Sequence, residues 1–168
     1  MAAARSIDLG IDLLANASEP PPILGMLMCL RGECDVFNGE ANSAVVRTEA
    51  GIAIVRRHPD ACGAWPEAFC MWNAANAKHA DGDVDAAVAL LDACAEIARR
   101  RGLRVGEIVA CNTLGEIWEE RAVLDESRRF WERTLRCRRE IDAVNMGIHG
   151  SIPQNLLKAA RRARRRPG

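Results

Sequence analysis

A helical pattern that recurs three times is the feature that most constrains how this chain folds. Each block has an apolar helix with a small residue, a turn, and a second helix with another small residue. The blocks begin near Leu24, Glu67 and Ile108. The small residues and turns are, in order, Gly32, Gly39 and Ala44; Ala75, Gly82 and Ala87; Gly115, Ala122 and Ser127. The turns lie 43 and 40 residues apart, a period that predicts stacked helix pairs.

The rest of the chain also has helical periodicity, and no segment alternates apolar and polar residues as a strand does. Helices are expected over 6–16, 23–37, 40–57, 66–80, 84–101, 104–121 and 125–142. A last amphipathic helix follows the capping box Ser151-x-x-Gln154. The sequence therefore predicts an all-α fold in three parts: an N-terminal capping helix and proline-rich connector over 1–22, three helix pairs over 23–145, and a C-terminal capping helix with an arginine-rich tail over 146–168.

Composition favours one soluble, cytoplasmic domain without a metal or cofactor. The 168 residues suffice for a single core, and no apolar run approaches the roughly 20 residues that cross a bilayer. None of the seven cysteines forms a C-x-x-C pair, and the three histidines lie in separate blocks. Four cysteines occupy positions where a helix needs a small buried residue: Cys29, Cys70, Cys94 and Cys111.

Charge is distributed unevenly along the chain. Residues 1–98 carry 6 Arg and Lys against 14 Asp and Glu, whereas residues 99–168 carry 17 against 9. In a row of helix pairs this order predicts a charge dipole along the row, which favours steering of an acidic partner or head-to-tail self-association. The alternative is an arginine-rich surface that is merely solvated.

The cations of 158–166 allow a second pair of interpretations. A basic tail can contact nucleic acid, but the pI is about 6.8 and no aromatic residue lies between these arginines to stack on bases. The tail also suits the end of a helix, where cations offset the helix dipole. The second interpretation is favoured, and nucleic acid is not the expected partner.

The three blocks resemble tetratricopeptide repeats (TPRs) of an extended type, over about residues 24–142. The third block carries the clearest match, through Leu114, Gly115, Trp118, Ala122, Ser127, Trp131 and Leu135. The second block departs at Lys78, and the first at Asp35 and Thr48, where the family usually has aromatic residues. The resemblance implies a right-handed superhelix of about three antiparallel pairs.

The resemblance to TPRs also implies a concave groove that binds a peptide or a partner helix. By position in the pattern, the groove residues are Cys29, Glu33, Phe37, Trp72, Asn76, His79, Asn112, Glu116 and Glu119. Trp72 beside amides suits an extended peptide, and the alternative is that Trp72 is buried between repeats. The predicted groove has no Lys or Arg that could bind a C-terminal carboxylate of a partner. Its residues in the third repeat are acidic.

The expected function is therefore a non-enzymatic protein–protein interaction module of the adaptor or chaperone type. No nucleophile elbow, phosphate-binding loop or H-E-x-x-H motif is present. Two alternatives stay open: a sensor segment resembling the extended TPRs of LuxR-family transcription activators, and a homo-oligomeric scaffold that assembles through its charge dipole.

Overall fold

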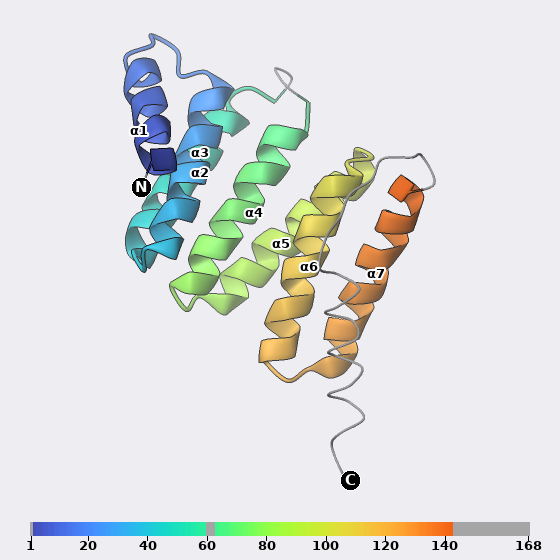
Figure 1. Cartoon of the computed structure of the whole chain (residues 1–168). Coiled ribbons are helices and arrows are strands. Elements are labelled where there is room, and N and C mark those ends of the chain that lie inside the picture. Colours follow the sequence, from blue (N-terminus) through green and yellow to red (C-terminus); the bar gives the residue numbers. More distant parts are fainter. Residues whose placement is uncertain (1, 60–62, 143–168) are drawn as a thin grey trace.

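The computed structural model describes residues 2–59 and 63–142, and every regular element in these residues is a helix (Figure 1). The elements are α1 (Ala2–Ala15), α2 (Pro22–Phe37), α3 (Ala41–Arg56), α4 (Trp65–Ala80), α5 (Val84–Arg100), α6 (Arg104–Glu120) and α7 (Leu124–Asp142). The seven predicted helices and the all-α class are confirmed in this part of the chain. The expected helix from Ser151 onward lies outside it. None of the described helices is long and apolar enough to span a membrane.

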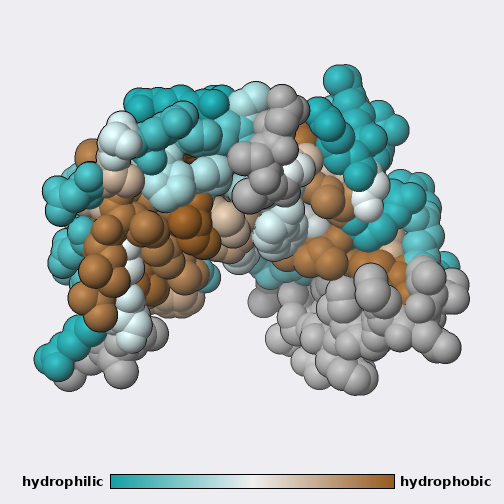
Figure 2. All heavy atoms as spheres, turned by 90° about the horizontal axis from the view of Figure 1, so that it is seen from above, coloured by the Kyte–Doolittle hydropathy of each residue, from teal (hydrophilic) through white to brown (hydrophobic). Residues whose placement is uncertain are grey.

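The helices form a row of hairpins in two layers. Helices α2, α4 and α6 run in one direction, and α3, α5 and α7 return beside them (Figure 1). Each helix contacts its partner in the hairpin, α2 also contacts α4, and α4 contacts α6, while α1 packs on α2. Figure 2 shows the described atoms curving into an arch. We call the surface of α2, α4 and α6 on the hollow side the inner face.

Small residues set the distance between paired helices. A Cβ atom on Gly25 of α2 would lie 2.5 Å from the carbonyl oxygen of Gly51 in α3. A Cβ on Gly115 of α6 would lie 2.7 Å from the ring of Trp131 in α7. The hydroxyl of Ser127 donates to the carbonyl of Gly115 over 2.9 Å. The small residues predicted at the contacts therefore do lie where the backbones approach most closely.

Four of the turns between helices share one geometry. After α2, α4, α5 and α6, the residue with a positive φ is Gly39, Gly82, Gly102 or Ala122, with φ of 79°, 89°, 68° and 60°. In each turn the next amide bonds to a carbonyl five residues back, as in Asp83 N–H to Lys78 over 2.9 Å. This is the Schellman type of helix end, which favours glycine at the left-handed position. Of the four residues at this left-handed position, Ala122 is the one that is not glycine.

The buried cysteines act as small apolar residues. Cys29, Cys70, Cys94 and Cys111 have no exposed surface, as predicted. Burial raises the pKa of the Cys94 and Cys111 thiols to about 12. These thiols are therefore neutral at physiological pH and packed away from solvent.

We expect Ala87→Leu to destabilise the fold by about 1–3 kcal/mol, because Ala87 is fully buried at the contact between α4 and α5. The control is Ala89→Leu, on the exposed side of the same helix. Urea denaturation measures both free energies of unfolding. Equal stabilities for the two variants would show that Ala87 is not at a tight contact.

We expect Ala122→Gly to stabilise the protein by about 0.5–1 kcal/mol, since glycine adopts a positive φ without the steric cost that alanine bears. The matched change is Gly82→Ala, at the same position of another turn. A Cβ there would touch nothing within 4 Å, so only backbone strain should destabilise that variant, by about 1 kcal/mol. Shifts of the same sign in both variants would contradict the shared turn geometry.

Candidate functional site

Two side-chain contacts join α4 to α6 on the inner face. The indole Nε1 of Trp72 donates to the hydroxyl of Thr113 over 3.1 Å. His79 Nε2 lies 3.0 Å from an oxygen of Glu120. Thus Trp72 and His79, two predicted groove residues of α4, contact α6 at Thr113 and Glu120, which adjoin the predicted residues in sequence.

Trp72 is partly buried between α4 and α6 and partly exposed on the inner face. Its ring is half-buried and packs against the core, and its indole N–H is used by Thr113. The remaining surface of the ring is exposed beside Asn76, four residues along the same helix. Trp72 therefore holds α4 against α6 and also contributes apolar surface to the inner face.

The predicted residues of α6 form an acidic group. Asn112 donates to Glu116 over 3.0 Å, which leaves the Asn112 carbonyl oxygen without a hydrogen bond among the described residues. Burial raises the pKa of the Glu116 carboxyl above its usual range, and Glu120 and Glu119 raise it further. The bond from Asn112 opposes this shift. The surroundings of Glu116 therefore disfavour its ionised form.

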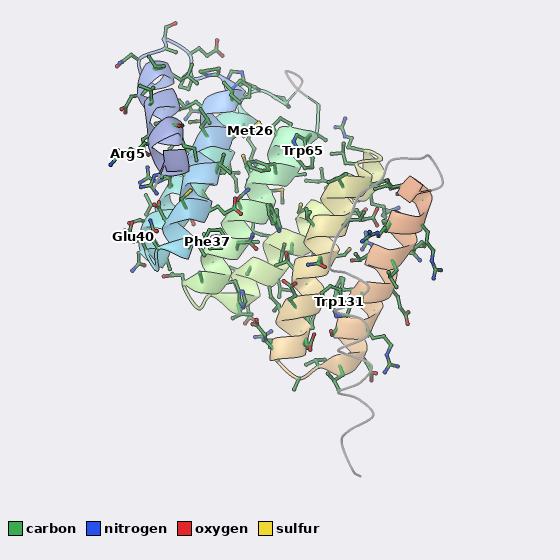
Figure 3. The ribbon with its side chains drawn as sticks, viewed as in Figure 1. Arg5, Met26, Phe37, Glu40, Trp65 and Trp131 are labelled. Atoms are coloured by element: carbon green, nitrogen blue, oxygen red, sulfur yellow. The ribbon has the colours of Figure 1, made fainter. Side chains whose placement is uncertain are left out.

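On α2 one predicted groove residue, Cys29, is buried and does not reach the inner face. Cys29 has no exposed surface, because its thiol points at α3 and lies 3.7 Å from the carbonyl oxygen of Thr48. Glu33 is half-buried, and burial raises the pKa of its carboxyl. Phe37 is 82% exposed at the end of α2, far from Met26 and Trp65, which lie at the opposite end of this layer (Figure 3).

The inner layer is apolar toward the starts of its helices. Ile23, Trp65 and Val105 are exposed there, and Met26 and Phe69 pack partly buried beside them. Figure 2 shows apolar atoms gathered on the arm of the arch that the N-terminal helices form. A cavity of about 650 Å³ opens where α4 and α6 begin and α7 ends, lined by Trp65, Leu103, Arg104, Val105, Glu140 and Ile141, with the glycines at 102 and 106.

Sequence reasoning missed Thr113, Met26 and Phe69. Thr113 follows Asn112 directly, and the stripe 109, 113, 116, 120 could have found it as a second row on the same helix. Met26 and Phe69 carried no signal beyond that of ordinary core residues.

Charge is also separated across the row, between its two edges. The turns α2–α3, α4–α5 and α6–α7 form an acidic edge, with Glu40, Asp81, Asp83, Asp85, Glu119, Glu120, Asp125 and Glu126 against Lys78, His79 and Arg121. The opposite edge carries Arg56, Arg57, Arg99, Arg100, Arg101, Arg104, Arg138 and Arg139 against Glu19, Glu67, Glu107 and Glu140. Because successive helices run in opposite directions, acidic residues lie at one edge of the row and basic residues at the other. The order of charges along the chain alone did not show this separation.

Within the described residues, no group of three His, Cys, Asp or Glu side chains is arranged to hold a metal ion. Comparisons of the chain with protein-family models, curated proteins and solved structures found no match. The surface itself therefore carries the functional argument.

We expect Glu116→Gln to stabilise the protein slightly at pH 7, by up to about 0.5 kcal/mol, as for other surface changes. The folded state raises the pKa of Glu116, so its ionised form reduces stability above that pKa. The gain should shrink as the pH falls through the raised pKa, where the wild-type carboxyl becomes neutral. Melting temperatures from pH 7 to pH 4 test this, and a gain that grows on acidification would contradict it.

Proposed function

We propose that the protein is a non-enzymatic interaction module of the TPR type, in which the inner face binds a peptide or helix of a partner protein. Four features support the superhelical arrangement that the resemblance implied. The helix pairs repeat at a regular spacing along the chain, and each helix contacts its neighbours in the row. In addition, α2 contacts α4, and α4 contacts α6. Glycine or alanine occurs at the close contacts within the pairs.

The composition of the inner face carries the proposal. Parallel helices present an aromatic ring at Trp72, amides at Asn76 and Asn112, and a carboxylate at Glu116 on adjacent segments. Aromatic surface supplies binding energy when water is removed, and amides pair with peptide backbone groups. Such a surface suits an extended or helical polypeptide better than a small molecule.

We expect full-length protein to capture a partner from an extract of its source cells, and Phe37→Ser combined with Asn76→Ala and Asn112→Ala to lose that partner. These side chains are wholly or partly exposed, so the fold should survive. The matched control is Val46→Ser, which removes an apolar group that is 69% exposed on α3.

Quantitative mass spectrometry of the captured proteins measures the result, and circular dichroism confirms that all variants fold. A partner retained by both variants, or lost from Val46→Ser alone, would place binding away from the inner face.

A further inference from the structure

Helix α1 has apolar residues on two sides. On the side that packs on α2, Ile7 is buried, and a Cβ atom on Gly10 would lie 3.0 Å from the side chain of Leu27. Leu9 and Leu13 are 60% and 73% exposed. These two leucines are four residues apart and therefore neighbours on the helix surface, on the side that points away from α2. Apolar residues on both sides are typical of a helix that packs between two neighbours.

The position of α1 in the row explains why its second side is open. Helix α3 packs against α2 and α4, and α5 packs against α4 and α6, whereas α1 lies at one end of the row and packs on α2 (Figure 1). Figure 3 shows Arg5 projecting from α1 on the side away from α2. Since Leu9 lies one helical turn after Arg5, the exposed leucines face out of the end of the row.

Two opposite charges accompany these leucines. Arg5 and Asp12 lie on the same exposed side of α1, and neither has a hydrogen bond or ion pair to another described residue. They are seven residues apart, or about 10 Å along the axis, which is too far for a contact within one helix. The exposed side of α1 therefore carries a cation before its leucines and an anion between them.

This order of charges is complementary to itself when it is reversed. If a second α1 packs antiparallel with the two Leu9 side chains at the centre, Arg5 of each copy lies within about 2 Å of Asp12 of the other along the axis. A parallel copy would instead place like charges side by side. Charge thus favours one relative direction of the two helices, the direction that a twofold axis produces.

We propose that the exposed side of α1 is a dimer contact, in which a second copy of the chain packs its α1 antiparallel across a twofold axis. Leu9 and Leu13 of the two copies interdigitate, and Arg5 of each copy pairs with Asp12 of the other. Such a contact closes after two copies, unlike head-to-tail association through the charge dipole. It lies at the end of the row, so it leaves the inner face open and does not rest on the proposed function.

Sedimentation velocity of the full-length chain at about 10–200 µM tests this, because a contact through one helix is small and should be weak. With rising concentration the mass should increase from 18.4 kDa towards twice that value. Leu9→Ser combined with Leu13→Ser should stay monomeric. The matched control is Val46→Ser, which removes an exposed apolar group of α3 and should dimerise like wild type. Circular dichroism checks that each variant folds.

A pair of charge variants tests the antiparallel direction. Arg5→Asp alone places acids against acids across the axis, and Asp12→Arg alone places bases against bases, so each variant should dimerise at least about tenfold more weakly than wild type. In an equal mixture of the two variants, both pairs across the axis are again opposite in charge, and dimers should return. Arg128→Asp, an exposed change on α7, should dimerise like wild type.

The inference is overturned if wild type stays monomeric over this range, if it forms species larger than a dimer, or if the double leucine variant still dimerises. It is also overturned if the mixed charge variants associate no better than either one alone. None of these outcomes changes the capture result for the inner-face variants, so the proposed function is tested separately.

Discussion

Close approach of helix backbones is the constraint on which the rest of the structure depends. At Gly25 and Gly51, and again at Gly115, there is no room for a further methyl group, because the opposing atoms would lie within 3 Å of it. Because protein interiors pack densely, two helices approach this closely only where the residue at the contact is small. With this spacing fixed, α2, α4 and α6 can share one layer and present a continuous inner face.

A network of polar side chains lies at Asp35, where the resemblance to TPRs predicts an aromatic residue. Asp35 is fully buried and accepts hydrogen bonds from Arg31 and Arg47, and Arg31 also bonds to Asp8 of α1 over 2.8 Å. This network ties α1, α2 and α3 together. A buried charge without such partners would cost several kcal/mol, so Asp35 is compatible with the core only because the arginines are there.

The repeat made the fold predictable, because helix periodicity, turn glycines and small contact residues all act locally. The site was less predictable. Cys29 occupies a groove position by repeat count, yet its small thiol fits the gap opposite Gly51 and is buried there. Thr113 acquires its role only through Trp72, 41 residues away, and no local pattern encodes such a contact. The Arg-rich segment after Lys158 lies outside the described residues.

The charges at the end of α6 depart from the pattern of the neighbouring helices. In α5, Asp85 begins the helix and Arg99 and Arg100 end it, which suits the helix dipole. α7 follows the same order, with acids in its first turn and Arg139 in its last. Helix α6 departs from this order at its end only, since Glu107 lies in its first turn but Glu119 and Glu120 end it without a basic residue in the last turn. These end charges oppose the dipole, but Glu120 has a partner within the fold, since it lies 3.0 Å from His79 of α4 and so helps to hold α4 against α6.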